Sequence, residues 1–202
     1  MMRTPDSAPR HAAIVLAAGR STRLGQPKQL LIVHGETLLR RAVRFALETA
    51  PAEVIVVLDP SAEAMRDQLD GLACRALVCA HAQQGMAASL RCGLSALDAR
   101  CDGALIVLTD QPALDGQHLR ALVARWQQDP RAAAASGYAG TIGVPAVLPR
   151  AWFDSLLDGD GDHGARDLLR TRRDQVRVID AAALALDLDS AADLERWKPP
   201  PT

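Results

Sequence analysis

The stretch AAIVLAAGRSTRLGQPK, residues 12–28, joins an apolar strand to a loop of small and basic residues. Ile14, Val15 and Leu16 predict a buried strand, and alanines and glycines follow them. Where large side chains are missing, backbone N–H groups can approach anionic oxygens, and nearby cations neutralise the charge. The loop therefore favours a polyphosphate ligand. Its glycines are Gly19 and Gly25, and its cations are Arg20, Arg23 and Lys28.

Two common phosphate-binding motifs do not fit this loop. A Walker loop needs a glycine, four residues and then Gly-Lys-Ser/Thr, whereas five residues separate Gly19 from Gly25 and Gln26 follows. The dinucleotide fingerprint needs three closely spaced glycines, and this loop has two. Taken one at a time, the three cations could also lie on the solvated edge of a βα turn.

Outward from this loop, apolar runs alternate with amphipathic stretches as far as about residue 128. The apolar runs lack strict alternation with polar residues, which is typical of parallel strands covered on both faces. The pattern predicts a doubly wound α/β fold, with a mostly parallel central sheet and helices on both faces. The expected strands are 12–17, 53–58, 74–79 and 103–109, and the expected helices are 37–49, one capped by Ser61, 86–97 and one capped by Asp115.

The rest of the sequence predicts shorter elements and no second domain. The expected strands are 132–140, 141–149 and 175–179, and the expected helices are 165–169 and 190–197. We find no internal repeat and no linker long enough to divide the chain. We therefore predict one domain at residues 11–197, preceded by a disordered tail at 1–10 and followed by a loose end at 198–202.

Composition excludes several classes of protein. The chain has 202 residues, 49% hydrophobic and 23% charged, as expected for one globular domain. A formal net charge of −1 provides no basic field for nucleic acid or an anionic membrane. We see no signal-peptide core and no membrane-spanning apolar run, so we expect a cytoplasmic protein. Scattered buried thiols are favoured over a zinc site, because no Cys-x-x-Cys pair occurs among Cys74, Cys79, Cys92 and Cys101.

The segment Thr109-Asp110-Gln111-Pro112 ends the expected strand 103–109. In open α/β sheets, ligands bind at the carboxyl ends of strands. An acid close to a proline can also simply serve a turn. Beside the 12–28 loop, however, Asp110 predicts a metal site, because Mg²⁺ prefers a few carboxylates together with phosphate oxygens.

LAAGRSTRLGQPK resembles the signature L-A-A/G-G-x-S-x-R-x-G-x-x-K of nucleotidyltransferases that bind a nucleoside triphosphate, and every fixed position matches. The chain most resembles the CTP:molybdopterin cytidylyltransferase branch of the MobA-like NTP transferases, which act on the molybdenum cofactor. This resemblance implies a Rossmann-like fold and transfer of CMP from CTP to molybdenum-bound molybdopterin, with release of pyrophosphate. Cytosine rather than guanine is implied by Ala18, since guanylyl-transferring relatives usually have glycine there.

The same resemblance implies roles for individual residues. Arg23 and Lys28 would hold the triphosphate, and Asp110, in a segment LTDQP that is similar to the family's strand end, would bind Mg²⁺ during catalysis. Residues 84–91 resemble the family motif G-M-x-x-S-L. The implied nucleotide-binding residues are Leu16, Ala17, Ala18, Gly19, Arg20, Ser21, Gly85 and Ser89.

Two further motifs imply an acceptor site and a second metal ligand. Residues 161–166 resemble the stretch G-D-x-G-A-R on the pterin side of the family's cleft, with His163 where Lys or Arg is common. Residues 186–194 resemble D-I-D-T-P-E-D-L, which implies that Asp189 binds metal; Asp189 could instead cap the last helix. The implied acceptor-binding residues are Gly143, Pro145, Asp162, His163, Gly164 and Arg166.

Two other functions stay open. The acceptor could be a sugar phosphate or a polyol phosphate, because the activating loop is shared while acceptor residues vary. Alternatively, the protein could be a non-catalytic accessory module that binds molybdopterin and passes it to a molybdenum-containing dehydrogenase. The presence of Arg23, Lys28 and Asp110 favours an enzyme.

Overall fold

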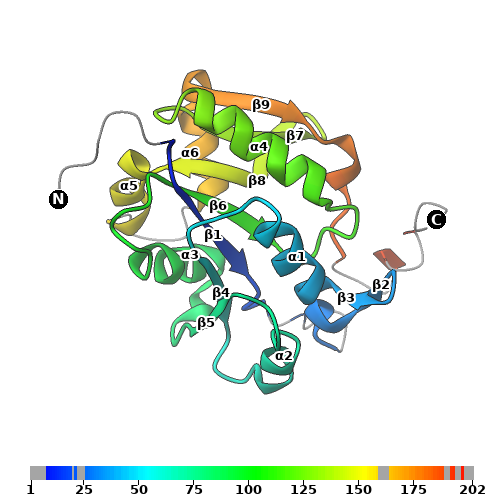
Figure 1. Ribbon diagram of the computed structural model, residues 1–202. Helices are drawn as coiled ribbons and strands as arrows, with labels where there is room; N and C mark the ends of the chain where they lie inside the picture. Colours follow the sequence, from blue (N-terminus) through cyan, green and yellow to red (C-terminus); the bar gives the residue numbers. More distant parts are fainter. Residues whose placement is uncertain are drawn as a thin grey trace.

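A computed structural model describes residues 8–19, 21, 26–158, 164–188, 192–193 and 197. Its centre is a seven-stranded sheet in the order β5-β4-β1-β6-β8-β7-β9 (Figure 1). The strands are β1 (His11–Leu16), β4 (Val54–Leu58), β5 (Arg75–Val78), β6 (Gly103–Leu108), β7 (Ala133–Tyr138), β8 (Thr141–Pro149) and β9 (Val176–Asp180). Neighbouring strands are parallel except where β8 runs antiparallel to β6 and β7.

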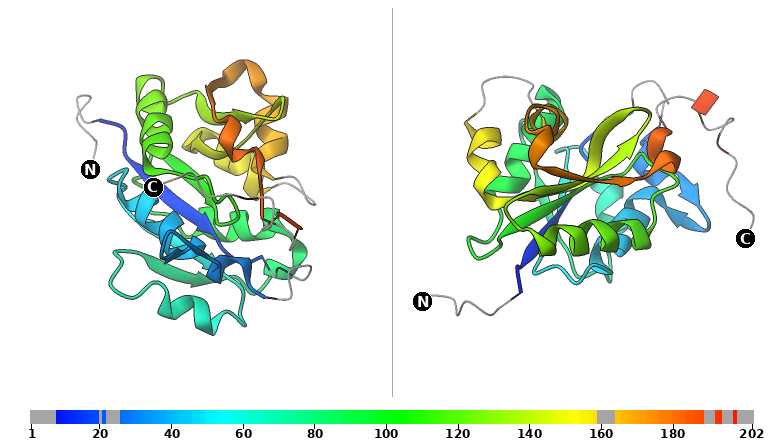
Figure 2. Two further views of the ribbon diagram at one scale, coloured as in Figure 1. Left: turned by 90° about the vertical axis from the view of Figure 1, so that its right-hand side faces the viewer. Right: turned by 90° about the horizontal axis from the view of Figure 1, so that it is seen from above.

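Helices cover both faces of this sheet (Figure 2). On one face lie α1 (Leu38–Leu47), α2 (Glu63–Asp67) and α4 (Gly116–Gln128), and on the other α3 (Met86–Ser95), α5 (Phe153–Leu157) and α6 (Ala165–Thr171). A short hairpin, β2 (Ile32–Val33) and β3 (Glu36–Thr37), stands apart from the main sheet. The 3-10 turns are η1 (Lys28–Leu30), η2 (Ala82–Gln84), η3 (Arg150–Trp152), η4 (Arg173–Gln175) and η5 (Ala182–Ala185). Among the residues that the structure describes, no helix is long and apolar enough to cross a membrane.

The predicted single α/β domain with a mostly parallel sheet is confirmed. All six residues of β1 are buried, because successive side chains enter two different cores. Ala13 and Val15 pack under α1 and α4, whereas Ile14 and Leu16 pack under α3. This two-sided burial explains why the strands read as continuous apolar runs.

Several local predictions need correction or extension. The Asp115 cap is confirmed, since its side chain accepts a hydrogen bond from the His118 N–H at 2.7 Å. The Ser61 cap is wrong: the Ser61 hydroxyl donates to Asp59 at 2.6 Å, and α2 begins only after Ala62. Helix α5 and the β2–β3 hairpin were not predicted.

Some predictions fall on residues that the structure leaves undescribed. Residues 1–7 of the expected tail, 198–202 of the loose end and most of the expected helix 190–197 belong to them. The boundaries 11–197 therefore stay a prediction. All four cysteines are free thiols; Cys79 and Cys101 are buried as expected, whereas Cys74 and Cys92 are half-buried.

The strand order determines where the chain's polar loops meet. From β1 the chain moves outward to β4 and β5, and α3 then returns it to β6, on the opposite side of β1. Leu16, the last residue of β1, lies beside Leu108, the last residue of β6. The connections leave these two strand ends on opposite sides, which creates the crevice where α/β proteins bind ligands.

A buried histidine at the start of β1 predicts sensitivity to acid. His11 Nε2 lies 2.9 Å from the Thr49 hydroxyl, and that hydroxyl donates to the Ala46 carbonyl, so Nε2 must donate. Burial lowers the pKa of His11 from 6.5 to about 4. The unfolded chain therefore binds this proton between pH 6.5 and 4 while the folded protein does not. The contribution of His11 to the free energy of unfolding is complete above pH 6.5, and it falls by about 3 kcal/mol as the pH drops to 4.

Urea unfolding at pH 7 and pH 4.5 measures this loss, with His11→Gln as the comparison. We expect the variant to lose less stability than the wild type over the same interval. Some loss remains, because burial also lowers the pKa of His118. Equal losses in both proteins would contradict the assignment to His11.

Candidate active site

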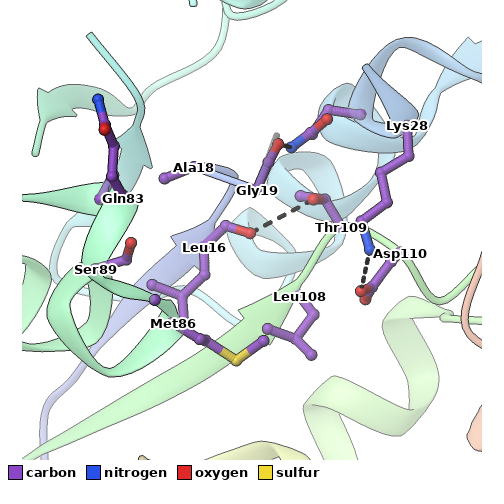
Figure 3. A pocket seen from close by; sticks show the side chains of 13 residues that line it. Leu16, Ala18, Gly19, Lys28, Gln83, Met86, Ser89, Leu108, Thr109 and Asp110 are labelled. Atoms are coloured by element: carbon purple, nitrogen blue, oxygen red, sulfur yellow. Dashed lines mark hydrogen bonds and ion pairs between the residues drawn. The ribbon is translucent and has the colours of Figure 1, made fainter. Parts of the chain in front are cut away.

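A hollow of about 320 Å³ lies at the carboxyl ends of β1 and β6 (Figure 3). Three elements supply its walls: the end of β1 and the loop after it, the end of β6, and the start of α3. The chain therefore builds the hollow from three segments that are separate in the sequence, within residues 16–29, 82–89 and 108–110. Its lining includes Leu16, Ala18, Gly19, Gly85, Ser89, Thr109 and Asp110.

Lys28 and Asp110 meet across this hollow. Lys28 Nζ lies 2.7 Å from Asp110 Oδ2, and their side chains are only 13% and 12% exposed (Figure 3). The second carboxylate oxygen, Oδ1, is buried and has no hydrogen-bond partner among the described residues. The expectation that these two residues share one site is met by the geometry. An orphaned carboxylate oxygen beside a cation is a polar centre that suits a charged ligand.

The loop after β1 is held from behind by a residue that the sequence analysis missed. Gln29 is fully buried and donates to the carbonyls of Ala17 and Gly19 at 3.0 and 2.6 Å. Ser21 accepts a hydrogen bond from the Lys28 N–H at 2.9 Å. Ala18 and Gly19 line the hollow, whereas Ala17 is buried behind it. The only sequence signal for Gln29 is a polar residue directly before the apolar run Leu30–Val33.

The start of α3 forms the opposite wall. Gly85, directly before α3, has φ +105°, a conformation that side chains with a Cβ rarely adopt. Ser89 is buried and lines the hollow. The amphipathic helix predicted at 86–97 buries Leu90 and Leu94, whereas Met86 is 55% exposed.

A second hollow of about 230 Å³ adjoins the first. Leu16, Met86 and Leu108 line both hollows, so that Met86 lies at their common boundary. Figure 3 shows these three side chains in the first hollow. The start of α6 closes the second hollow. Of the predicted acceptor-binding residues, Gly164 and Arg166 line it.

Gly143 and Pro145 are buried behind the wall of this second hollow, and only Val144 between them lines it. The Pro145 carbonyl accepts a hydrogen bond from Ser136 at 2.7 Å. A Cβ added at Gly143 would lie 2.5 Å from the Tyr138 hydroxyl oxygen. These two residues therefore shape the wall through Val144 rather than by lining the hollow.

Comparison with known proteins identifies the family. The model of the MobA-like NTP transferase domain matches residues 13–177. The chain belongs to this family of nucleotidyltransferases. As a MobA-like NTP transferase, it has its β1 loop, Asp110 and α3 start all within the matched segment.

Relatives of this MobA-like protein carry diverse names. Purine catabolism protein PucB from Bacillus subtilis is 32% identical over 168 residues, which is 78% of this chain and 80% of PucB. Nicotine blue oxidoreductase from Paenarthrobacter nicotinovorans is 29% identical over 196 residues, 91% of this chain and 94% of that protein. Bifunctional GlmU from Rhodococcus opacus is 33% identical over 147 residues, 69% of this chain, yet the match spans only 29% of GlmU.

A solved relative supports the same fold over nearly the whole chain. The crystal structure of Rv0371c from Mycobacterium tuberculosis superposes with a TM-score of 0.81 at 31% identity. The match covers 94% of this chain and 97% of Rv0371c. The Rossmann-like nucleotidyltransferase architecture is thus confirmed.

Five predicted site residues lie outside the described part of the chain, and their roles stay predictions. They are Arg20, Arg23, Asp162, His163 and Asp189. Among residues that the structure does describe, no group of three or more His, Cys, Asp or Glu side chains could hold a metal ion. Asp110 is the described carboxylate that lines the first hollow of this MobA-like enzyme.

Proposed function

We propose that this MobA-like enzyme transfers CMP from CTP to molybdenum-bound molybdopterin and releases pyrophosphate. The observation that carries this proposal is the meeting of Lys28 and Asp110, 82 residues apart, in one hollow at the switch point of the sheet. A cation and a carboxylate so placed suit a metal-bound triphosphate. The specific choice of cytosine and molybdopterin rests on the resemblance of the motifs.

A divalent metal fits the residues present. Oδ1 of Asp110, which is buried and has no hydrogen-bond partner within the described part of the chain, is a hard oxygen donor of the type that Mg²⁺ prefers, and phosphate oxygens would complete the coordination. Asp189 is the second proposed ligand. One structure of Rv0371c was determined as a complex with manganese, which supports a divalent ion in this family. When bound, Mg²⁺ would stabilise negative charge on the α-phosphate and on the leaving oxygen.

The remaining chemistry requires neutralisation of phosphate charge and in-line placement of the two substrates, and it requires no general base. The attacking group is an acceptor phosphate oxygen that is already anionic near neutral pH. Lys28 would hold the triphosphate as a point charge, and Arg23 would do so as a bidentate donor, and both would stabilise the departing pyrophosphate. The adjoining hollow would hold the acceptor in line with the α-phosphate, with Arg166 facing its anionic groups.

A thermal-shift screen of the four ribonucleoside triphosphates with Mg²⁺ tests the donor. At 100 times its dissociation constant, CTP should stabilise the protein by about 2.7 kcal/mol, which raises the midpoint by about 5–10 °C for a chain of this length. We expect GTP at the same concentration to give a smaller shift, and the CTP shift to shrink in EDTA. A larger shift with GTP would contradict the proposed base preference.

Pyrophosphate release with alternative acceptors tests the other half of the reaction. We expect release with CTP and molybdenum-bound molybdopterin, and none with sugar or polyol phosphates. Release with a sugar or polyol phosphate alone would establish the alternative transferase. Binding of the pterin without consumption of CTP would establish the accessory role.

A further inference from the structure

Gln29 connects the two parts of the proposed triphosphate site. Its side chain is fully buried. Nε2 uses both hydrogens, one for the Ala17 carbonyl at 3.0 Å and one for the Gly19 carbonyl at 2.6 Å, and Oε1 accepts from the Ser21 hydroxyl at 3.4 Å. A single amide thus holds three points of the loop after β1.

The segment that carries Lys28 is hydrogen-bonded to the same loop. Gln29 and Lys28 are neighbours in η1, and the Lys28 N–H donates to the Ser21 hydroxyl at 2.9 Å. Hydrogen bonds therefore run both ways between η1 and the loop: Lys28 and Gln29 donate to the loop, and Ser21 donates to Gln29. Lys28 reaches Asp110 from this fixed base.

These hydrogen bonds determine which way the loop's amides point. In a trans peptide the N–H points opposite to the preceding carbonyl, so tying the Ala17 carbonyl to Gln29 turns the Ala18 N–H away from Gln29. Ala18 and Gly19 both line the hollow. Among the residues that the structure describes, neither of their N–H groups has an acceptor. They are donors left available for an anionic ligand.

We propose that Gln29 is a positioning residue for the nucleotide: it orients the Ala18–Gly19 backbone and Lys28 toward the phosphates without touching them itself. This inference rests on the proposed binding of a triphosphate, and it does not depend on the base or the acceptor. Misplacement of such groups by about 1 Å can cost about 100-fold. Gly19 has no side chain to restrict its backbone, so the hydrogen bond from Gln29 to its carbonyl supplies a restraint that the residue itself lacks.

Gln29→Glu is the sharpest test, because it keeps size and changes only hydrogen bonding. A carboxylate donates no hydrogen, so at pH 8 it would face two carbonyl oxygens as an acceptor. A protonated Glu regains one donor, and burial favours that neutral form. We expect CTP binding with Mg²⁺, measured by calorimetry, to be weakened about 10- to 100-fold at pH 8 and to recover partly at pH 6.

Two controls separate this effect from charge and from folding. Gln117→Glu adds the same charge at an exposed position on α4, outside both hollows, and should bind CTP nearly as the wild type does at both pH values. Gln29→Met fills the space without any hydrogen bond, and should bind CTP weakly at both pH values. Measuring the wild type at each pH corrects for effects of pH on binding that do not involve position 29. Circular dichroism and thermal unfolding show which variants are folded.

The outcomes are distinct. Folded Gln29→Glu or Gln29→Met protein with wild-type CTP affinity at pH 8 would overturn the positioning role. Preference of the wild type for another triphosphate would correct the proposed function, and the same comparison with that nucleotide would still test Gln29. Failure of the wild type to bind any triphosphate would overturn both.

Discussion

Replacing Lys28 with methionine is expected to lower the rate of CMP transfer by about 100- to 1,000-fold. Methionine keeps much of the side-chain length but removes the ammonium group that lies 2.7 Å from Asp110. Under the proposed function, that group holds the triphosphate and stabilises charge on the departing pyrophosphate. Pyrophosphate release at saturating CTP measures the loss. Arg125→Met, which removes a cation from the exposed face of α4, is the matched control.

The Lys28 variant also needs a control for stability. Without Lys28, the largely buried Asp110 carboxylate loses its ion-pair partner, which destabilises the folded protein by itself. The double variant Lys28→Met/Asp110→Asn removes both charges. We expect its unfolding midpoint to exceed that of Lys28→Met while its turnover stays at least as low. Turnover by Lys28→Met within a few-fold of the wild type would remove Lys28 from the catalytic machinery.

Replacing Asp110 with asparagine is expected to abolish the Mg²⁺ dependence of triphosphate binding. Asparagine keeps the shape of the side chain but loses the charge that would hold the ion. Loss of even an outer partner of a metal ligand costs about 10- to 100-fold in affinity, so we expect at least about a 100-fold loss here. Calorimetric titration with CTP, with and without Mg²⁺, measures it.

The control for Asp110→Asn is Asp67→Asn, an identical change at an exposed position on α2. It should leave both titrations unchanged. CTP affinity that still rises with Mg²⁺ in Asp110→Asn, as it does in the wild type, would exclude Asp110 as a metal ligand. Weak binding by Asp110→Asn in Mg²⁺-free buffer as well would indicate damage to the hollow itself, which thermal unfolding of the variant would reveal.

The strands and most helices could be predicted because burial leaves a local pattern. Residues 103–109 read as an apolar run, and β6 occupies 103–108 with every side chain buried. The polar residue that follows this strand was equally visible in the sequence, since Asp110 comes directly after residue 109. The antiparallel direction of β8 was not visible, because an apolar strand carries the same pattern whichever way it runs.

The errors arise from hydrogen bonds and exposure that residue type and spacing do not reveal. Ser61 has the right chemistry for a cap, but Asp59 two residues earlier takes its hydroxyl. Met86 has the right spacing for the core, but it lies where two hollows meet and is 55% exposed among the described residues. Gln29 is polar and yet fully buried, because its three hydrogen-bond partners lie in the loop after β1.

By itself, the sequence determined the alternation of strands and helices, the chemical character of the β1 loop and the family to which the chain belongs, since each is carried by residues close together in the chain. Only the tertiary structure decided that Lys28 and Asp110 touch, that Gln29 holds the loop between them and that two hollows adjoin. The physical reason is that strand order brings β6 beside β1, and hydrophobic periodicity within a segment carries no information about which segment becomes its neighbour.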